Sequence, residues 1–242
     1  MVESCGFSRD DVVLEIGPGR GALTPLIAGK VKKVYAVELD RALAAQLPET
    51  LKDVPNLSVI NADILRFDIR TIPETREGKI KVFGNIPYYI TSPIIEHLFG
   101  YRAVIRTVFL TVQKEFAQRI CAGPGSREYG SFSLYAQYYS RPNQLFTVKK
   151  NSFYPAPKVD SSFIRLDIRD RPPVEGDEKA LFKVIRAAFQ QRRKTLRNSL
   201  KGLIGEPELD TVFDRCRLDP KVRPERLSLQ DFSCIAGQTA VQ

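Results

Sequence analysis

Two glycines and an acidic residue are spaced as in a nucleotide-binding site. Gly17 and Gly19 lie in the stretch LEIGPGRGALT, directly after a short apolar segment, and Glu38 follows about 20 residues later. Glycines here allow a tight turn and the close approach of a ligand, and a carboxylate at this distance can bind ribose hydroxyls. The pattern Gly17-x-Gly19-x-x-Ala22 fits a nicotinamide cofactor as well as S-adenosylmethionine, so the loop alone leaves both open.

Polar side chains follow two further apolar segments. Asp63 ends the stretch NLSVINAD, and Asn85 follows KIKVFG. In an open sheet of parallel strands the carboxyl ends meet at one edge, where ligands bind. Asp63 therefore has two interpretations, a helix cap or solvated turn residue on the one hand, and an acceptor for an adenine amino group on the other.

The stretch FGNIPYYITSP, residues 83–93, places an amide, a proline and two aromatic rings in one turn. Glycine, asparagine and proline are ordinary turn residues. The pair Tyr88 and Tyr89 is less ordinary, because exposed tyrosines suit stacking on a planar ligand such as a base. This turn is the main candidate for a catalytic segment.

The elements that must position these residues alternate between strands and helices. Such alternation is typical of βαβ units and a parallel sheet, so we expect an α/β fold. The five predicted strands are residues 11–17, 33–40, 56–63, 79–84 and 104–112, with helices predicted at 21–30 and 41–47.

The pattern changes after these units. Residues 143–150 and 161–169 look like strands with no helix between them, which predicts an antiparallel hairpin closing the sheet. The stretch DRPPVEGDE, residues 170–178, is typical of a linker. Beyond it, apolar residues recur at three, four or seven positions as on one helical face: Phe182, Ile185, Phe189, Leu196, Leu200 and Leu203. We therefore predict domains at 1–168 and 169–242.

Composition restricts the function classes. The net charge of +9 favours an acidic partner such as nucleic acid, although a merely basic surface fits equally well. No apolar run reaches the length of a membrane helix and no signal peptide is evident, so we expect no membrane association. The four cysteines are far apart and there is one histidine, so we expect no metal site and reduced thiols in the cytoplasm.

Several segments together resemble the rRNA adenine N6-methyltransferases, and most of all the KsgA type of rRNA adenine N6,N6-dimethyltransferase. They are VVLEIGPGRGALT, VYAVELD, NADIL, FGNIPYYIT, NSFYPAPKVDSSFIRL and FQQRRKTLRNSL. The resemblance implies a Rossmann-like class I methyltransferase sheet with a small C-terminal helical domain. It implies S-adenosylmethionine as cofactor and dimethylation of two adjacent adenines in small-subunit rRNA. By the same resemblance, the cofactor is bound by Gly17, Gly19, Glu38, Asp63 and Asn85.

The chemistry explains the turn at residues 83–93. The N6 amine of adenine is a poor nucleophile, because its lone pair is delocalised into the ring. Two acceptors on its N–H bonds, the Asn85 amide oxygen and a backbone carbonyl near Ile86–Pro87, would favour a pyramidal nitrogen. Pro87 fixes this backbone, and Tyr88 can stack on the base. The resemblance places Phe153 at the other face of the base, although a core phenylalanine is the alternative; Tyr89 receives no role.

Two basic stretches are candidates for RNA contact. The stretch RAAFQQRRKTLRNSLK, residues 186–201, carries six Lys or Arg and no acidic residue. Residues 113–131 contain the turn GPG, which we expect to be flexible. Both stretches can instead be ordinary solvated surface. The predicted RNA-binding residues are Arg119, Arg127, Arg192, Arg193, Lys194 and Arg197.

Relatives carry a basic segment with a Gln-Asn-Phe-Leu motif before the first strand, and it helps to bind the cofactor. Residues 1–10 do not contain this motif, so we expect weak cofactor binding and slow turnover. We expect a monomer. The alternatives are a resistance-type methyltransferase of large-subunit rRNA, a non-catalytic RNA-binding assembly or transcription factor on the same fold, and a nicotinamide-dependent oxidoreductase.

Overall fold

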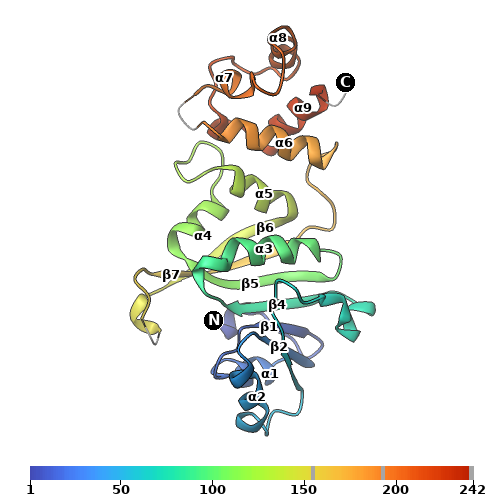
Figure 1. The fold of residues 1–242 in the computed structure, drawn as a ribbon, viewed down its shortest axis with the longest axis vertical. Coiled ribbons are helices and arrows are strands. Elements are labelled where there is room, and N and C mark those ends of the chain that lie inside the picture. The colour runs from blue at the N-terminus through green and yellow to red at the C-terminus, as the bar shows by residue number, and fades with distance from the viewer. Residues whose placement is uncertain (154–155, 192–193, 240–242) are drawn as a thin grey trace. The chain divides into compact units, whose positions relative to one another are not determined.

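The structure, a computed structural model, describes residues 1–153, 156–191 and 194–239 (Figure 1). The chain divides into two compact units. The sheet unit comprises Met1–Ala117 and Ser140–Asp170, and the helical unit comprises Gln118–Tyr139 and Arg171–Gln242. The break after Asp170 lies near the predicted boundary at 168. Residues 118–139, which the prediction placed in the first domain, group with the C-terminal helices.

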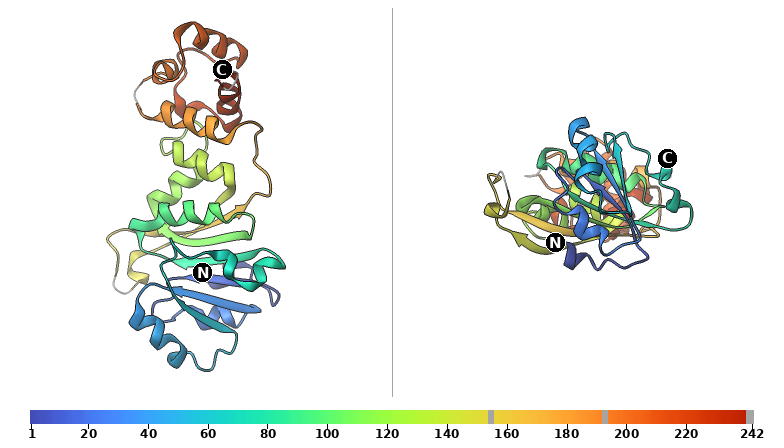
Figure 2. Two further views of the ribbon diagram at one scale, coloured as in Figure 1. Left: turned by 45° about the vertical axis from the view of Figure 1, so that its right-hand side comes forward. Right: turned by 90° about the horizontal axis from the view of Figure 1, so that it is seen from below.

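The sheet unit is built on seven strands in the order β3-β2-β1-β4-β5-β7-β6. The strands from β1 to β5 run parallel, and β7 pairs antiparallel with both β5 and β6 (Figure 2). This arrangement confirms the predicted α/β class and the predicted hairpin. The strands are β1 (Val12–Ile16), β2 (Lys33–Glu38), β3 (Leu57–Asn61), β4 (Ile80–Asn85), β5 (Ile105–Gln113), β6 (Ser140–Val148) and β7 (Ser161–Ile168).

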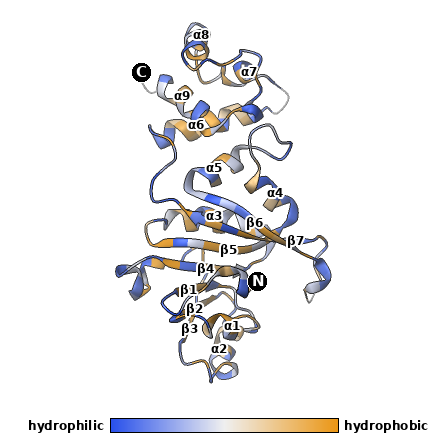
Figure 3. Cartoon of the chain, turned by 180° about the vertical axis from the view of Figure 1, so that it is seen from behind, coloured by the Kyte–Doolittle hydropathy of each residue, from blue (hydrophilic) through white to orange (hydrophobic). Residues whose placement is uncertain are grey.

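The central strands form the core of the sheet unit. They read as nearly continuous apolar runs (Figure 3), because both faces of a parallel sheet are covered. Strand β1 is buried along its whole length. The helices of this unit are α1 (Thr24–Ala28), α2 (Arg41–Thr50) and α3 (Thr91–Gly100), and α4 (Lys114–Cys121) begins here. Short 3-10 turns are η1 (Val2–Cys5), η2 (Ile69–Thr71), η3 (Pro73–Arg76), η4 (Tyr88–Ile90) and η5 (Lys150–Ser152).

The helical unit contains α5 (Ser131–Tyr139), α6 (Glu178–Phe189), α7 (Leu196–Leu200), α8 (Glu206–Arg215), η6 (Pro224–Arg226) and α9 (Leu229–Thr239). The apolar face predicted across residues 182–203 is divided between α6 and α7. The reason is local, because Thr195 has an extended backbone and its side chain accepts a hydrogen bond from Asn198 N–H, which starts a new helix. None of the described helices is long and apolar enough to cross a membrane.

A disulfide joins Cys216 and Cys234, whose Cα atoms are 5.8 Å apart. The expectation of four reduced thiols is therefore wrong for this pair, whereas Cys5 and Cys121 are free. The sequence separation of 18 residues gave no motif. The pairing depends on the packing of α9 beside α8, which brings the two positions together.

Candidate functional site

The loop after β1 has the backbone that the glycine pattern predicts. Gly17 and Gly19 have φ angles of 64° and 60°, in the left-handed region that favours glycine. The Gly17 N–H donates to the Val37 carbonyl at 2.9 Å, which fixes the loop against the end of β2. The glycine loop therefore lies at the carboxyl edge of the sheet, as a ligand-binding loop must.

Glu38 closes this loop from β2. The residue is 7% exposed, its Oε2 accepts from Gly19 N–H at 3.0 Å, and its Oε1 accepts from Asp40 N–H at 2.9 Å. Asn61 on β3, which the sequence reasoning missed, donates from Nδ2 to the Glu38 carbonyl at 2.9 Å. The carboxylate is thus held in place by backbone donors, and each oxygen retains a lone pair for a hydroxyl ligand.

Asp63 follows β3 and has the geometry of a turn cap. Its Oδ1 accepts from Leu65 N–H at 3.0 Å, and Oδ2 lies 3.9 Å from Arg66 Nε. Asp63 is therefore a turn residue rather than a helix cap. A cofactor role for Asp63 stays a prediction and would use the lone pairs that these contacts leave.

The turn after β4 is fixed by its backbone. A Cβ at Gly84 would meet Ile86 Cγ2 and Leu110 Cδ2 at 3.0 Å, so close packing requires glycine there. Asn85 is exposed and Ile86 is buried. The Pro87 carbonyl accepts from Ile90 N–H at 3.3 Å, whereas no backbone donor among the described residues bonds the carbonyl of Ile86. Asn85 and Ile86 thus leave two acceptors next to each other.

The predicted catalytic residues line one cavity of about 640 Å³ in the sheet unit. It is lined by all four of them, Asn85, Pro87, Tyr88 and Phe153. The other lining residues are Met1, Ala22, Leu23, Ile86, Val148, Ser152 and Pro157. Its volume is in the range of small-molecule sites. Ala22 and Leu23 follow the glycine loop directly, so the cavity adjoins the predicted cofactor site.

Aromatic side chains enter this cavity from two separate segments. The Tyr88 hydroxyl bonds Ser161 Oγ on β7 at 2.5 Å, which ties the ring to the sheet. Phe153 is half-buried and belongs to the β6–β7 connection. Tyr89 is 84% exposed and does not line the cavity. Two rings from separate segments thus line the cavity, and the contact of Tyr88 with β7 fixes one of them.

Glu15 is a feature of the site that sequence reasoning missed. It lies on β1 two residues before Gly17 and is 3% exposed, and its Oε2 has no hydrogen-bond partner in the described part of the chain. Burial raises the pKa of the Glu15 carboxyl to about 7. The only signal was one charged residue within the apolar stretch VVLEI. Such an orphaned acceptor beside a ligand loop is suited to a cationic ligand group.

The predicted RNA-binding residues fall in the helical unit and differ in their surroundings. Arg119, Arg127 and Lys194 are exposed, and Arg192 and Arg193 lie outside the described residues. Arg197 was predicted to contact RNA, but its side chain is only 23% exposed and bonds Asp210 at 2.5 Å and Glu206 at 2.8 Å. These carboxylates, Asp210 first, raise the pKa of Arg197.

The GPG turn of residues 123–125 is also held in place, contrary to the expected flexibility. The Gly125 N–H donates to the Glu225 carbonyl at 2.7 Å, and a Cβ at Gly125 would lie 3.1 Å from Arg226 Nη1. Both contacts are within the helical unit. The turn is thus attached to η6 by its backbone.

Comparison of the sequence with known proteins gives matches over nearly the whole chain. The family profile described as ribosomal RNA adenine dimethylase matches residues 1–239. The chain is 42% identical over 234 residues to ribosomal RNA small subunit methyltransferase A of Clostridium botulinum (strain Langeland), covering 96% of this chain and 85% of the relative. It is 41% identical over 239 residues to the protein of the same name from Acinetobacter baylyi, covering 98% and 85%.

Comparison with solved structures gives similar folds. The crystal structure of the 23S rRNA methyltransferase ErmE matches with a TM-score of 0.77 at 25% identity, covering 99% of this chain and 95% of that one. A dimethyladenosine transferase from Plasmodium falciparum matches with a TM-score of 0.83 at 24% identity, covering 97% and 91%. The second likeness concerns the fold alone.

Proposed function

Because the chain belongs to the ribosomal RNA adenine dimethylase family, we propose that it transfers methyl groups from S-adenosylmethionine to N6 of two adjacent adenines in small-subunit rRNA. The sequence relatives named for the small subunit reach 42% identity, whereas the 23S rRNA enzyme ErmE reaches 25%. This difference favours the small subunit over the large one. The family match also disfavours the nicotinamide-dependent alternative.

The residues at the sheet edge fit S-adenosylmethionine. The left-handed glycine loop allows close approach, and Glu38 offers lone pairs to ribose hydroxyls. The orphaned Oε2 of buried Glu15 fits the ammonium group of the methionine part, since a buried carboxylate is satisfied best by a charged donor. When bound, the cofactor supplies an electrophilic methyl group on a sulfonium.

The turn after β4 supports the transfer step. Asn85 Oδ1 and the Ile86 carbonyl would accept the two N–H hydrogens of the adenine amine, which directs its lone pair at the methyl carbon. The lone pair directed in this way would accept the methyl group that the bound cofactor supplies, and the amine would then lose a proton. Because this proton becomes acidic only after transfer, the contribution of the protein is mainly positioning and electrostatics.

The observation that carries this proposal is the shared cavity. Asn85, Pro87 and Tyr88 come from β4 and the turn after it, and Phe153 comes from the β6–β7 connection, yet all line one pocket beside the glycine loop. A base held between the rings of Tyr88 and Phe153 would present its edge to Asn85. Stacking contributes roughly 1–3 kcal/mol per base.

We propose further that exposed cations of the helical unit contact rRNA, namely Arg119, Arg127 and Lys194. The predicted contacts of Arg192 and Arg193 belong to the same proposal. The enzyme would act as a monomer in the cytoplasm. The net charge of +9 supports an RNA partner, because neutralised phosphates release counterions.

The test is methyl transfer from radiolabelled S-adenosylmethionine to undermethylated small and large ribosomal subunits, assayed in parallel. We expect labelled N6,N6-dimethyladenosine in the rRNA of the small subunit alone. Label in the large subunit would establish the resistance-type alternative. Tight binding to subunits without transfer would establish a non-catalytic RNA-binding factor instead.

A further inference from the structure

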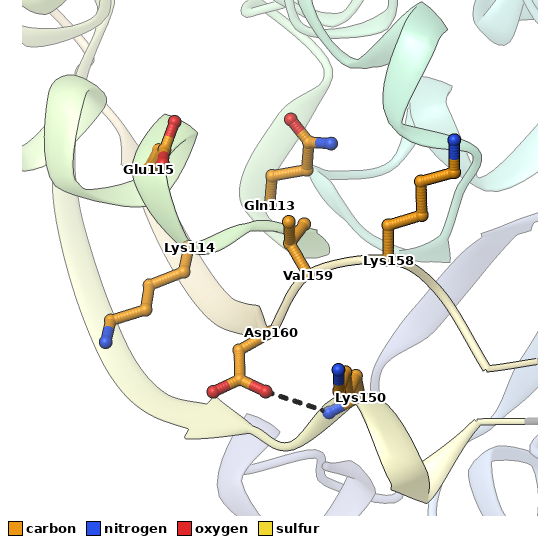
Figure 4. A pocket seen from close by; sticks show the side chains of 7 residues that line it. All are labelled: Gln113, Lys114, Glu115, Lys150, Lys158, Val159 and Asp160. Carbon is orange, nitrogen blue, oxygen red and sulfur yellow. Dashed lines mark hydrogen bonds between the residues drawn. The ribbon is translucent and has the colours of Figure 1, made fainter.

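A second cavity of the sheet unit has a different character from the catalytic one. It has a volume of about 460 Å³ and is lined by Gln113, Lys114, Glu115, Lys150, Val159 and Asp160, together with Lys158 (Figure 4). Its three lysines come from three separate segments, at the start of α4, in η5 and before β7. All three are exposed, and none of them forms an ion pair with another described residue.

Asp160 connects these segments by hydrogen bonds. Its Oδ1 accepts from Lys150 N–H at 3.0 Å (Figure 4). Its carbonyl accepts from Lys114 N–H at 3.1 Å, and its Oδ2 lies 3.3 Å from Lys149 Nζ. The hydrogen bond from Lys150 N–H first, and then Lys149 and the charge of Lys114, lower the pKa of the Asp160 carboxyl. Its charge is thus engaged mainly by a backbone donor and by Lys149, which does not line the cavity. Three lysines therefore line a cavity whose second acidic residue is Glu115.

The cavity lined by Lys114, Lys150 and Lys158 is called the basic cavity below, and the one lined by Asn85 and Tyr88 the catalytic cavity. One connecting segment lines part of both. In the β6–β7 connection, Ser152, Phe153 and Pro157 line the catalytic cavity, whereas Lys150 and Lys158 line the basic one. Residues on the same short segment thus present aromatic and apolar groups to one cavity and ammonium groups to the other. A nucleotide whose base enters the catalytic cavity carries its phosphates just outside it.

We propose that the cavity of Lys114, Lys150 and Lys158 binds the phosphodiester backbone of the rRNA strand beside the target adenine. Lysine is a point-charge phosphate ligand, and phosphate contacts fix the register of a nucleic acid without reading its sequence. This site would set which adenine reaches Asn85. The inference rests on the proposed function and adds a contact surface on the sheet unit to those predicted on the helical unit.

The test removes two charges and keeps the shape of the side chains. In the double variant Lys150→Gln, Lys158→Gln, the backbone bond from Lys150 to Asp160 remains possible. We expect the KM for undermethylated small subunits to rise roughly tenfold, since hydrogen bonds to charged groups are among the stronger ones. Affinity for S-adenosylmethionine, measured by calorimetry, is expected to stay the same. For a single-stranded oligoribonucleotide, the slope of log K against log salt is expected to fall by about 0.7 for each phosphate that the variant no longer neutralises.

Two further variants make the result specific. The matched control is Lys32→Gln, Lys52→Gln, which removes the same charge from exposed positions of the sheet unit outside this cavity. The charge-retaining variant Lys150→Arg, Lys158→Arg is expected to keep the wild-type salt slope. If the double variant of the cavity lysines and the control double variant had the same salt slope, the inference would be overturned. A wild-type protein inactive on both subunits would refute the proposed function, while the slopes would still decide the phosphate site.

Discussion

The carboxyl edge of the sheet unit and the basic stretch of the helical unit fix their predicted functional residues in different ways. At the sheet edge, Glu38 is held by two backbone N–H groups, and Tyr88 is tied to Ser161. In the basic stretch, Arg197 is engaged by two carboxylates while Lys194 is exposed. A sheet ladder determines where a strand end lies, whereas on a helix surface the neighbouring side chains decide whether a cation is available.

The largest expected effect is at the sheet edge. Replacing Asn85 with alanine removes one of two acceptors for the adenine amine, and we expect methyl transfer to fall about 10²–10³-fold, as when one preorganised polar group is removed from an active site. Single-turnover kinetics at saturating cofactor and subunits would measure it. The control is Asn143→Ala, an exposed asparagine on β6. A normal rate in the Asn85 variant would reduce the turn to a structural role.

The second prediction concerns Glu15, whose pKa is raised to about 7 from an ordinary 4.5 by burial. Between pH 4.5 and 7 the folded protein binds a proton at Glu15 that the unfolded chain releases. The contribution of Glu15 to the free energy of unfolding is therefore greatest below pH 4.5 and falls as pH rises to 7. We expect Glu15→Gln to be more stable than wild type above pH 7, by an amount on the order of 3 kcal/mol.

Denaturant unfolding without cofactor from pH 4 to 8 measures this difference. The difference in the free energy of unfolding between wild type and Glu15→Gln is expected to grow between pH 4.5 and 7. Glu49→Gln, at an exposed position on α2, serves as control and is expected to follow the wild-type curve. A gap that does not change with pH would show that Glu15 is already ionised and partnered in the folded protein.

The third prediction moves to the helical unit. Reducing the Cys216–Cys234 disulfide is expected to destabilise that unit by about 3 kcal/mol, because it frees a short loop in the unfolded chain. Hydrogen exchange should quicken in α8 and α9 and stay unchanged in β1 and β4. The Cys216→Ser, Cys234→Ser variant should show the same exchange with and without reductant. Faster exchange in both units would mean that they do not unfold separately.

The sequence predicted what depends on local pattern. The five parallel strands, the left-handed glycines and the turn at Asn85 follow from apolar runs and residue type, and the structure has them close to the predicted positions. Parallel strands then bring their ends to one edge without further information. This is why residues as distant as Gly17, Glu38 and Asn85 could be placed together from the sequence alone.

What the sequence missed depends on neighbours that are distant along the chain. The orphaned state of Glu15 follows from burial on all sides, and the basic cavity follows from the antiparallel pairing of β7 with β5, which places Lys158 near Lys114. The Cys216–Cys234 pair depends on helix packing. The carboxylates that engage Arg197 come from α8, a helix that the charge pattern of residues 186–201 does not contain.

The smallest expected effect separates two cations of the basic stretch. Lys194 is exposed, so its removal leaves one phosphate without a cation, and we expect Lys194→Ala to flatten the salt slope of subunit binding by about 0.7–0.9. Arg197→Ala should leave the slope unchanged, because Asp210 and Glu206 already neutralise the guanidinium. Filter binding to small subunits between low and moderate salt measures both slopes. Equal flattening would show that RNA displaces the carboxylates from Arg197, and the surface of the helical unit would then be arranged by its ligand rather than beforehand.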